Sequence, residues 1–209
     1  MVSYNDPMEK SRIAALVDGI FAVAMTLLVL DLKLPEGVKI NSDPEAWRRL
    51  LELTGRISTY GLSFIVLGTF WIGHHSLFHF VRKINRGVLW LNLLFLLFIT
   101  LLPFSTNLLS GYSHLQIPVV IFGINLLLIS LSSLLQLSYL ARHPELCHNQ
   151  LTPSWIANLR RRTAIPILIV VASIAVSFYN PHLAMSTYWL LLAFHFLPGK
   201  HHRPPEVDN

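Results

Sequence analysis

One acidic residue, Asp18, lies inside the first long apolar stretch of the chain, residues 12–32. A carboxylate within a membrane-spanning helix is costly unless it faces water or a partner, so it marks a candidate functional position. Asn92 and His75 follow in the next two apolar stretches, at a matching depth. A charge-assisted Asp–His–Asn network would keep the carboxylate ionised. It would serve either as a clamp between helices or in gating or proton sensing. Further candidate partners are Trp71, His74, Ser76 and His79.

The same stretch also carries a row of aliphatic side chains. At about 100° per residue, the row shares a helix face that is different from the face of Asp18. Such a row is typical of lipid contact or core packing, and a ring of such rows can also narrow a pore. The periodicity alone leaves these alternatives open. The row consists of Leu16, Val23, Leu27 and Leu30, with Arg12 projecting onto it.

Six apolar segments have lengths that suit, or nearly suit, a bilayer core. The chain is 53% hydrophobic and only 13% charged, whereas a soluble domain of this size would need more charge on its surface. We therefore predict an all-α membrane protein, with one six-helix domain over residues 1–200 and a disordered tail at 201–209. The spans are predicted at 13–32, 57–80, 87–109, 115–140, 164–178 and 183–197, with an amphipathic helix from Glu45 leading continuously into the second.

The basic residues predict the orientation of these spans. With a cytoplasmic N-terminus, eleven of the sixteen Lys and Arg residues lie inside, so both termini are predicted to be cytoplasmic. We assign the basic clusters to topology and to contact with the lipid bilayer, and expect no nucleic-acid partner. The eleven are Lys10, Arg12, Arg82, Lys83, Arg86, Arg142, Arg160, Arg161, Arg162, Lys200 and Arg203.

Enzymatic signatures are sparse. His75 and His79 have a spacing that could ligate zinc, but there is no Glu between them of the H-E-x-x-H type and no nearby cysteine. A membrane-embedded metal enzyme is kept as a minor hypothesis. We expect no catalytic residues, no metal and no cofactor. A TVGYG-like filter, a P-loop and the G-x-G-x-x-G and G-x-S-x-G motifs are all missing from the sequence.

The first three segments resemble the short bacterial branch of the transmembrane protein 175 family, the endosomal/lysosomal potassium channel family. Its motif is Arg, three residues, then Phe-Ser-Asp. Arg12 and Asp18 match that motif, while Leu16 and Val17 stand for Phe and Ser. The WIGHH segment, Asn92 and the Leu-Pro-Phe sequence at 102–104 add to the likeness.

The resemblance implies a potassium-selective cation channel, with modest preference over sodium and no carbonyl filter. It implies a homotetramer of six-span subunits in the bacterial inner membrane, with the pore lined by the first helix of each subunit. Potassium is the implied ion, together with other monovalent cations and protons.

Roles for particular residues follow from the same resemblance. Val23, Leu27 and Leu30 would form a hydrophobic constriction, or gate, and Thr26 a nearby hydroxyl layer. The motif and interhelical network would comprise Arg12, Asp18, His74, His75 and Asn92. The alternative is a proton- or cation-coupled transporter of small solutes that uses Asp18 and the histidines of the second span as a relay.

Overall fold

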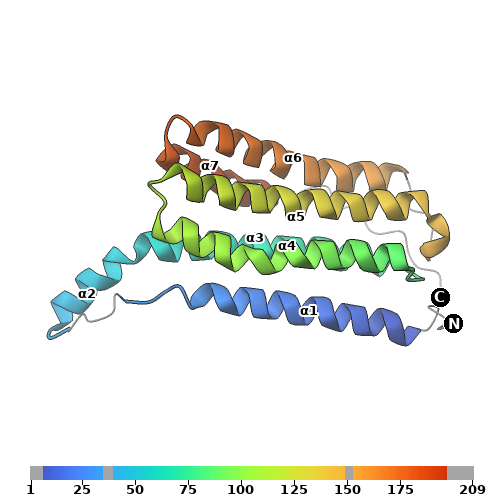
Figure 1. Ribbon diagram of the computed structural model, residues 1–209, viewed down its shortest axis with the longest axis horizontal. Helices are drawn as coiled ribbons and strands as arrows, with labels where there is room; N and C mark the ends of the chain where they lie inside the picture. Colours follow the sequence, from blue (N-terminus) through green and yellow to red (C-terminus); the bar gives the residue numbers. More distant parts are fainter. Residues whose placement is uncertain (1–6, 35–39, 149–152, 197–209) are drawn as a thin grey trace.

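The computed structural model describes residues 7–34, 40–148 and 153–196. Long helices lie side by side, each running antiparallel to the next along the chain, and a short helix leans away from one end (Figure 1). The predicted tail at 201–209 lies outside the described residues. In chain order the elements are α1 (Pro7–Val29), α2 (Asp43–Glu52), α3 (Thr54–His79), α4 (Arg86–Gly111), α5 (Gln116–Arg142), the 3₁₀ turn η1 (Pro144–Leu146), α6 (Pro153–Ser177) and α7 (Pro181–Phe196).

Four of the described helices are long and apolar enough to cross a membrane: α1 from Lys10 onward, α3, α4 and α5. The prediction of an all-helical membrane protein is therefore confirmed. The fifth and sixth predicted spans correspond to α6 and α7, which do not meet the same criteria within the described residues. The first turns of α6 carry Arg160 and Arg161, and α7 has 16 residues. Whether these two helices cross the membrane stays a prediction.

Several helix ends differ from the sequence prediction. α1 stops at Val29, and residues 30 and 31 form a turn. α2 and α3 are separate helices, whereas the sequence predicts one continuous helix. Between them the Leu53 N–H donates to the Leu50 carbonyl at 3.1 Å, an i→i−3 contact that interrupts the regular α-helical ladder. α6 begins at Pro153, well before residue 164, and contains Pro166.

The bundle is built on α4. α1 packs against α4 and α3, α5 packs on the other side of α4, and α6 and α7 pack on α5 and on each other. α7 also contacts α3, which closes the bundle. Gly123 lets α5 come close to α7, because a Cβ there would collide with the Tyr188 hydroxyl. That hydroxyl donates to the Val119 carbonyl at 2.9 Å, so one aromatic residue fixes α7 on α5.

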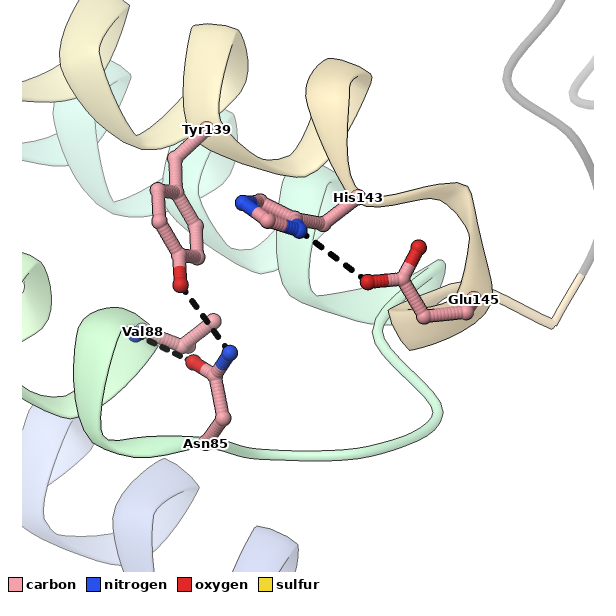
Figure 2. Close-up of polar contacts among 5 residues, drawn as sticks. All are labelled: Asn85, Val88, Tyr139, His143 and Glu145. Carbon is pink, nitrogen blue, oxygen red and sulfur yellow. Dashed lines mark hydrogen bonds and ion pairs between the residues drawn. The ribbon is translucent and has the colours of Figure 1, made fainter.

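The α3–α4 and α5–α6 connections are joined at one end of the bundle. Val81 and Cys147 form an antiparallel bridge, and the Arg82 N–H donates to the Leu146 carbonyl at 2.7 Å. The side chain of Asn85 makes two hydrogen bonds at this end of the bundle (Figure 2). Its Oδ1 accepts from the Val88 N–H at 2.9 Å, which caps α4, and its Nδ2 donates to the hydroxyl of Tyr139 on α5 at 3.0 Å.

Basic residues gather at this same end. α1 and α4 begin there, α3 and α5 end there, and α6 begins there (Figure 1). Next to Tyr139, His143 Nδ1 lies 3.0 Å from Glu145 Oε1 (Figure 2). A hydrogen bond to the backbone and, to a smaller extent, this contact with His143 lower the pKa of Glu145. The described basic residues at this end are Lys10, Arg12, Arg82, Lys83, Arg86, Arg142, Arg160 and Arg161.

Cys147, the single cysteine of the chain, is buried beside η1. Burial, with the nearby Glu145 carboxylate as a smaller cause, raises the pKa of its thiol. Alkylation needs an accessible thiolate, so we expect the folded protein to react with a maleimide severalfold more slowly at pH 7.5 than the unfolded protein in SDS. The rate should increase as the pH approaches the raised pKa. Mass spectrometry of timed samples measures both rates, and equal rates would contradict the prediction.

Candidate functional site

One face of α1 attaches this helix to the bundle. Val17, Phe21, Ala24 and Leu28 recur at helical spacing and are at most 2% exposed. They belong to the main hydrophobic core, where the Phe21 ring lies 6.0 Å from the ring of Phe95 on α4. The orientation of α1 about its own axis is therefore set by this apolar row.

A second face of α1 points away from the bundle and carries the predicted aliphatic row, which Leu30 continues in the turn after the helix. Val23 is 57% exposed, Leu27 43% and Leu30 55%. Core packing within the subunit is thus excluded for these three side chains, while lipid contact and a pore both stay open. Thr26 is also exposed, and its hydroxyl donates to the Val23 carbonyl at 2.8 Å.

Asp18 has an indole as its partner. Trp71 Nε1, on α3, donates to Asp18 Oδ1 at 2.8 Å. Asp18 is itself exposed on the surface of the single subunit. Arg12 is exposed at the start of the helix, and no ion pair joins it to Asp18 in the part of the chain that the structure describes. The contact joins the middle of α1 to α3.

His74 and Asn92 form a separate, buried contact between α3 and α4. His74 Nε2 lies 2.8 Å from Asn92 Oδ1, so the ring nitrogen carries the hydrogen in this arrangement. The imidazole is stacked between two phenylalanine rings, 4.2 Å from that of Phe78 and 5.2 Å from that of Phe95. This pair lies in the interior of the subunit, away from the exposed row of α1.

The single Asp–His–Asn network expected from the sequence is thus divided into two contacts. His74, and not His75, meets Asn92, and the partner of Asp18 is Trp71. His75 is exposed, with its ring 5.8 Å from that of Trp71. Trp71 is one of the candidate partners that the sequence offers, and the structure gives it the role of hydrogen-bond donor to Asp18. The available signal was its indole N–H, one helical turn before His75.

Replacing Asn92 by leucine is expected to destabilise the protein by about 1–3 kcal/mol, because the buried His74 N–H loses its acceptor. Scanning fluorimetry of protein in detergent measures the change as a lower melting temperature. The double variant His74→Leu/Asn92→Leu should lose less than the two single variants together, since neither polar group is left unpaired. Strictly additive losses would contradict a direct coupling between the two side chains.

A metal centre receives no structural support. Among the described residues, no three His, Cys, Asp or Glu side chains lie close enough to hold an ion. His75 and His79 are both exposed on α3. Two other interior polar residues join helices: the Asn125 amide hydrogen-bonds the Ser105 hydroxyl at 3.1 Å, and Gln136 Nε2 donates to the Leu91 carbonyl at 3.1 Å.

The fold and the site together define a helical integral membrane protein whose first helix presents an exposed aliphatic row. Residues 12–103 match the family described as endosomal/lysosomal potassium channel TMEM175. A potassium channel of Chryseobacterium sp. (strain P1-3) is 31% identical over 194 residues, covering 92% of this chain and 95% of that relative. The chain therefore belongs to the TMEM175 family, an ion channel family and not an enzyme family.

Two further relatives agree with this assignment. The human endosomal/lysosomal proton channel TMEM175 is 34% identical over 115 residues, which cover 53% of this chain and 23% of the human protein. The crystal structure of a lysosomal potassium-selective channel TMEM175 homolog from Chamaesiphon minutus superposes with a TM-score of 0.76 at 25% identity. It covers 90% of this chain and 97% of the other, so the likeness extends to α6 and α7.

Proposed function

We propose that this protein is a potassium-selective cation channel whose pore is lined by α1. The proposal rests on the exposed row formed by Val23 and Leu27 on the first helix and by Leu30 in the turn that follows it, in a TMEM175 family member. A solved relative that covers most of this chain is titled a potassium-selective channel. In a subunit that stands alone the row meets lipid, whereas in a ring of subunits it meets the permeating ion.

The proposed constriction selects through dehydration. Aliphatic side chains cannot replace the water that an ion loses on entering the neck. Potassium releases its water more readily than sodium, so a hydrophobic neck favours potassium modestly. The Thr26 hydroxyl donates its hydrogen to the Val23 carbonyl, which leaves its oxygen lone pairs free to accept. We assign it as a hydroxyl layer between the Val23 and Leu27 rings.

Four copies are proposed to close around the pore axis. α1 is the outermost long helix of the bundle on its side, so its free faces are accessible to neighbouring copies (Figure 1). Ala15, Gly19 and Ala22 form an exposed strip of small residues next to the aliphatic row. Small residues allow helices to approach closely in membranes. A single heterologous contact repeated by rotation closes into a ring.

The charge distribution supports the proposed orientation. Most of the described basic residues gather at the end of the bundle where α1 begins, whereas Lys33, Arg48, Arg49 and Arg56 lie toward the opposite end. By the positive-inside rule this end faces the cytoplasm, and with α6 and α7 as the fifth and sixth spans both termini lie there. We propose the inner membrane of a bacterium as its location.

The test is electrical. Purified protein in planar bilayers should pass potassium current, and with potassium on one side and sodium on the other the reversal potential should show a modest preference for potassium. Protein-free bilayers with the same detergent are the control. Electrical silence with active, saturable uptake of a solute would overturn the channel proposal.

A coupled transporter is the second candidate, and one observation favours it. Asp18 and His75 are both exposed, and each contacts the side chain of Trp71, so two titratable groups share one indole as a neighbour. Such a pair could relay protons through water. The transporter predicts slow, saturable, pH-coupled flux in liposomes, whereas the channel predicts current that scales with the driving force.

A further inference from the structure

The chain leaves regular helical geometry at the end of α1, and Leu30 lies in the turn that follows. The Leu30 N–H donates to the Leu27 carbonyl at 3.2 Å and the Leu32 N–H to the Val29 carbonyl at 3.0 Å. Both are i→i−3 contacts, so the helical ladder no longer fixes the chain there. Leu30 is 55% exposed, and packing within the subunit does not hold its side chain. Its position therefore depends on what holds the turn.

A side-chain contact from Asp31 holds this turn. Asn107 Nδ2, on α4, donates to Asp31 Oδ1. Within the described residues, it is the one side-chain hydrogen bond from residues 30–34 to another helix. Asp31, the residue next to Leu30, is thereby bonded to α4, the central helix of the bundle. The ring of Leu30 side chains is the outer ring of the proposed constriction.

Two aspartates thus tie α1 and its end to two different helices. Asp18 bonds to Trp71 of α3 at the middle of α1, and Asp31 bonds to Asn107 of α4 just beyond the last residue of α1, roughly 20 Å away along the helix axis. Between them lies the buried row that includes Phe21 and Leu28. The Asp18–Trp71 contact includes the aspartate of the family motif. The Asp31–Asn107 contact lies outside that motif.

A cavity of about 330 Å³ adjoins the Asp31–Asn107 hydrogen bond. It is lined by Asp31, Arg56, Asn107, Ser110, Gly111 and Tyr112. Among the described residues no ion pair joins Arg56 to Asp31, so the closest partner of the carboxylate is the neutral amide. A carboxylate at the edge of a half-open cavity can exchange one hydrogen bond for water at small net cost. The contact therefore biases the position of the turn without locking it.

We propose that Asp31 and Asn107 are a positioning pair that sets where Leu30 stands in the ion path. The pair acts through the turn at residues 30 and 31 and does not itself touch the ion. This inference rests on the proposed function, because it takes Leu30 as part of the constriction. Opening of the contact would let the outer ring move while Leu27, inside α1, keeps its place.

The test uses Asn107→Leu, which removes the donor, and the exchange Asp31→Asn/Asn107→Asp, which restores a hydrogen bond with donor and acceptor swapped. Tyr112→Phe changes the same cavity without touching the Asp31–Asn107 hydrogen bond and is the matched control. Each is combined with Leu30→Cys or Leu27→Cys, and the rate of modification by a membrane-impermeant cationic thiol reagent is measured. The wild-type chain, with Cys147 buried, gives the background rate. Reversal potentials between potassium and sodium are recorded for each variant without the added cysteine.

Asn107→Leu should change the modification rate at Leu30→Cys by at least about threefold, as expected for one net hydrogen bond, and leave Leu27→Cys unchanged. It should also shift the reversal potential, and the exchange should restore both readouts. An unchanged rate and potential would overturn the proposal. A change that the exchange fails to restore would also overturn it, because the Asp31 charge itself would then be what matters. If wild-type protein passes no potassium current, the proposed function fails, and the thiol rates still decide whether the pair positions Leu30.

Discussion

Replacing Leu27 by alanine is expected to increase potassium conductance and to reduce selectivity for potassium over sodium. The proposed constriction is a row of aliphatic side chains, and the barrier to an ion in such a neck is the water that it must lose. Truncation at every copy of Leu27 would leave room for water to remain with the ion. If the barrier falls by about 1.4 kcal/mol, the conductance rises about tenfold.

A matched control is an exposed leucine outside the proposed pore row, for which the opposite result is expected. Leu101, on α4, is 43% exposed, the same fraction as Leu27, yet it lies outside the proposed pore row. Leu101→Ala should leave both conductance and reversal potential as in wild type. Single-channel recordings and bi-ionic potentials in planar bilayers measure the two variants side by side. Equal behaviour of Leu27→Ala and Leu101→Ala would show that the exposed row of α1 contacts lipid and not ions.

Removing the indole donor with Trp71→Phe is expected to weaken assembly and lower potassium current at every pH. The Asp18 carboxylate would lose a 2.8 Å hydrogen bond from α3, a loss of about 1–3 kcal/mol for a bond to a charged group. Asp18→Asn should be milder, because an amide oxygen still accepts from the indole N–H. Melting temperature and oligomer size in detergent measure the effect, alongside pH–current curves.

Trp71→Phe and Asp18→Asn together distinguish two roles for Asp18, a clamp between helices and a proton sensor. If Asp18 holds α1 in place, the loss of stability follows the strength of the hydrogen bond, with Trp71→Phe worse than Asp18→Asn. A contradictory outcome would be an Asp18→Asn protein with unchanged melting temperature and a flattened pH–current curve. That result would assign the carboxylate to proton sensing. Ser76→Ala is a suitable control on α3, since the Ser76 hydroxyl bonds only to the Ile72 carbonyl of its own helix.

Helix positions were largely predictable, because long apolar segments bounded by Pro, Gly and charged residues leave few alternatives in a membrane protein. The errors occurred where local contacts override the pattern. Leu53 separates α2 from α3 although the sequence runs on without a proline, and α1 ends at Val29 although Leu30 and Leu32 extend the apolar pattern on either side of Asp31. Hydropathy does not distinguish a helical leucine from one in a turn.

The partners of the polar residues were only half predictable. A helical wheel gave the face of Asp18 and the depth of the histidines, yet it could not say which helix stands next to α1. His74 and His75 are adjacent and point about 100° apart on α3, so one faces Asn92 in the interior while the other is exposed. Trp71 reaches Asp18 because α1 packs against α3 as well as α4.

The sequence by itself determined that this is a helical membrane protein, where its four clearest spans lie, and that Asp18 and the aliphatic row occupy different faces of the first helix. These follow from composition and from the 3.6-residue period, which are properties of the chain alone. Only the tertiary structure decided that the row Val23, Leu27 and Leu30 is free, that Trp71 holds Asp18, and that Asn107 reaches Asp31. Exposure and partner choice depend on which helices are neighbours, and that is settled by packing between residues far apart in the sequence.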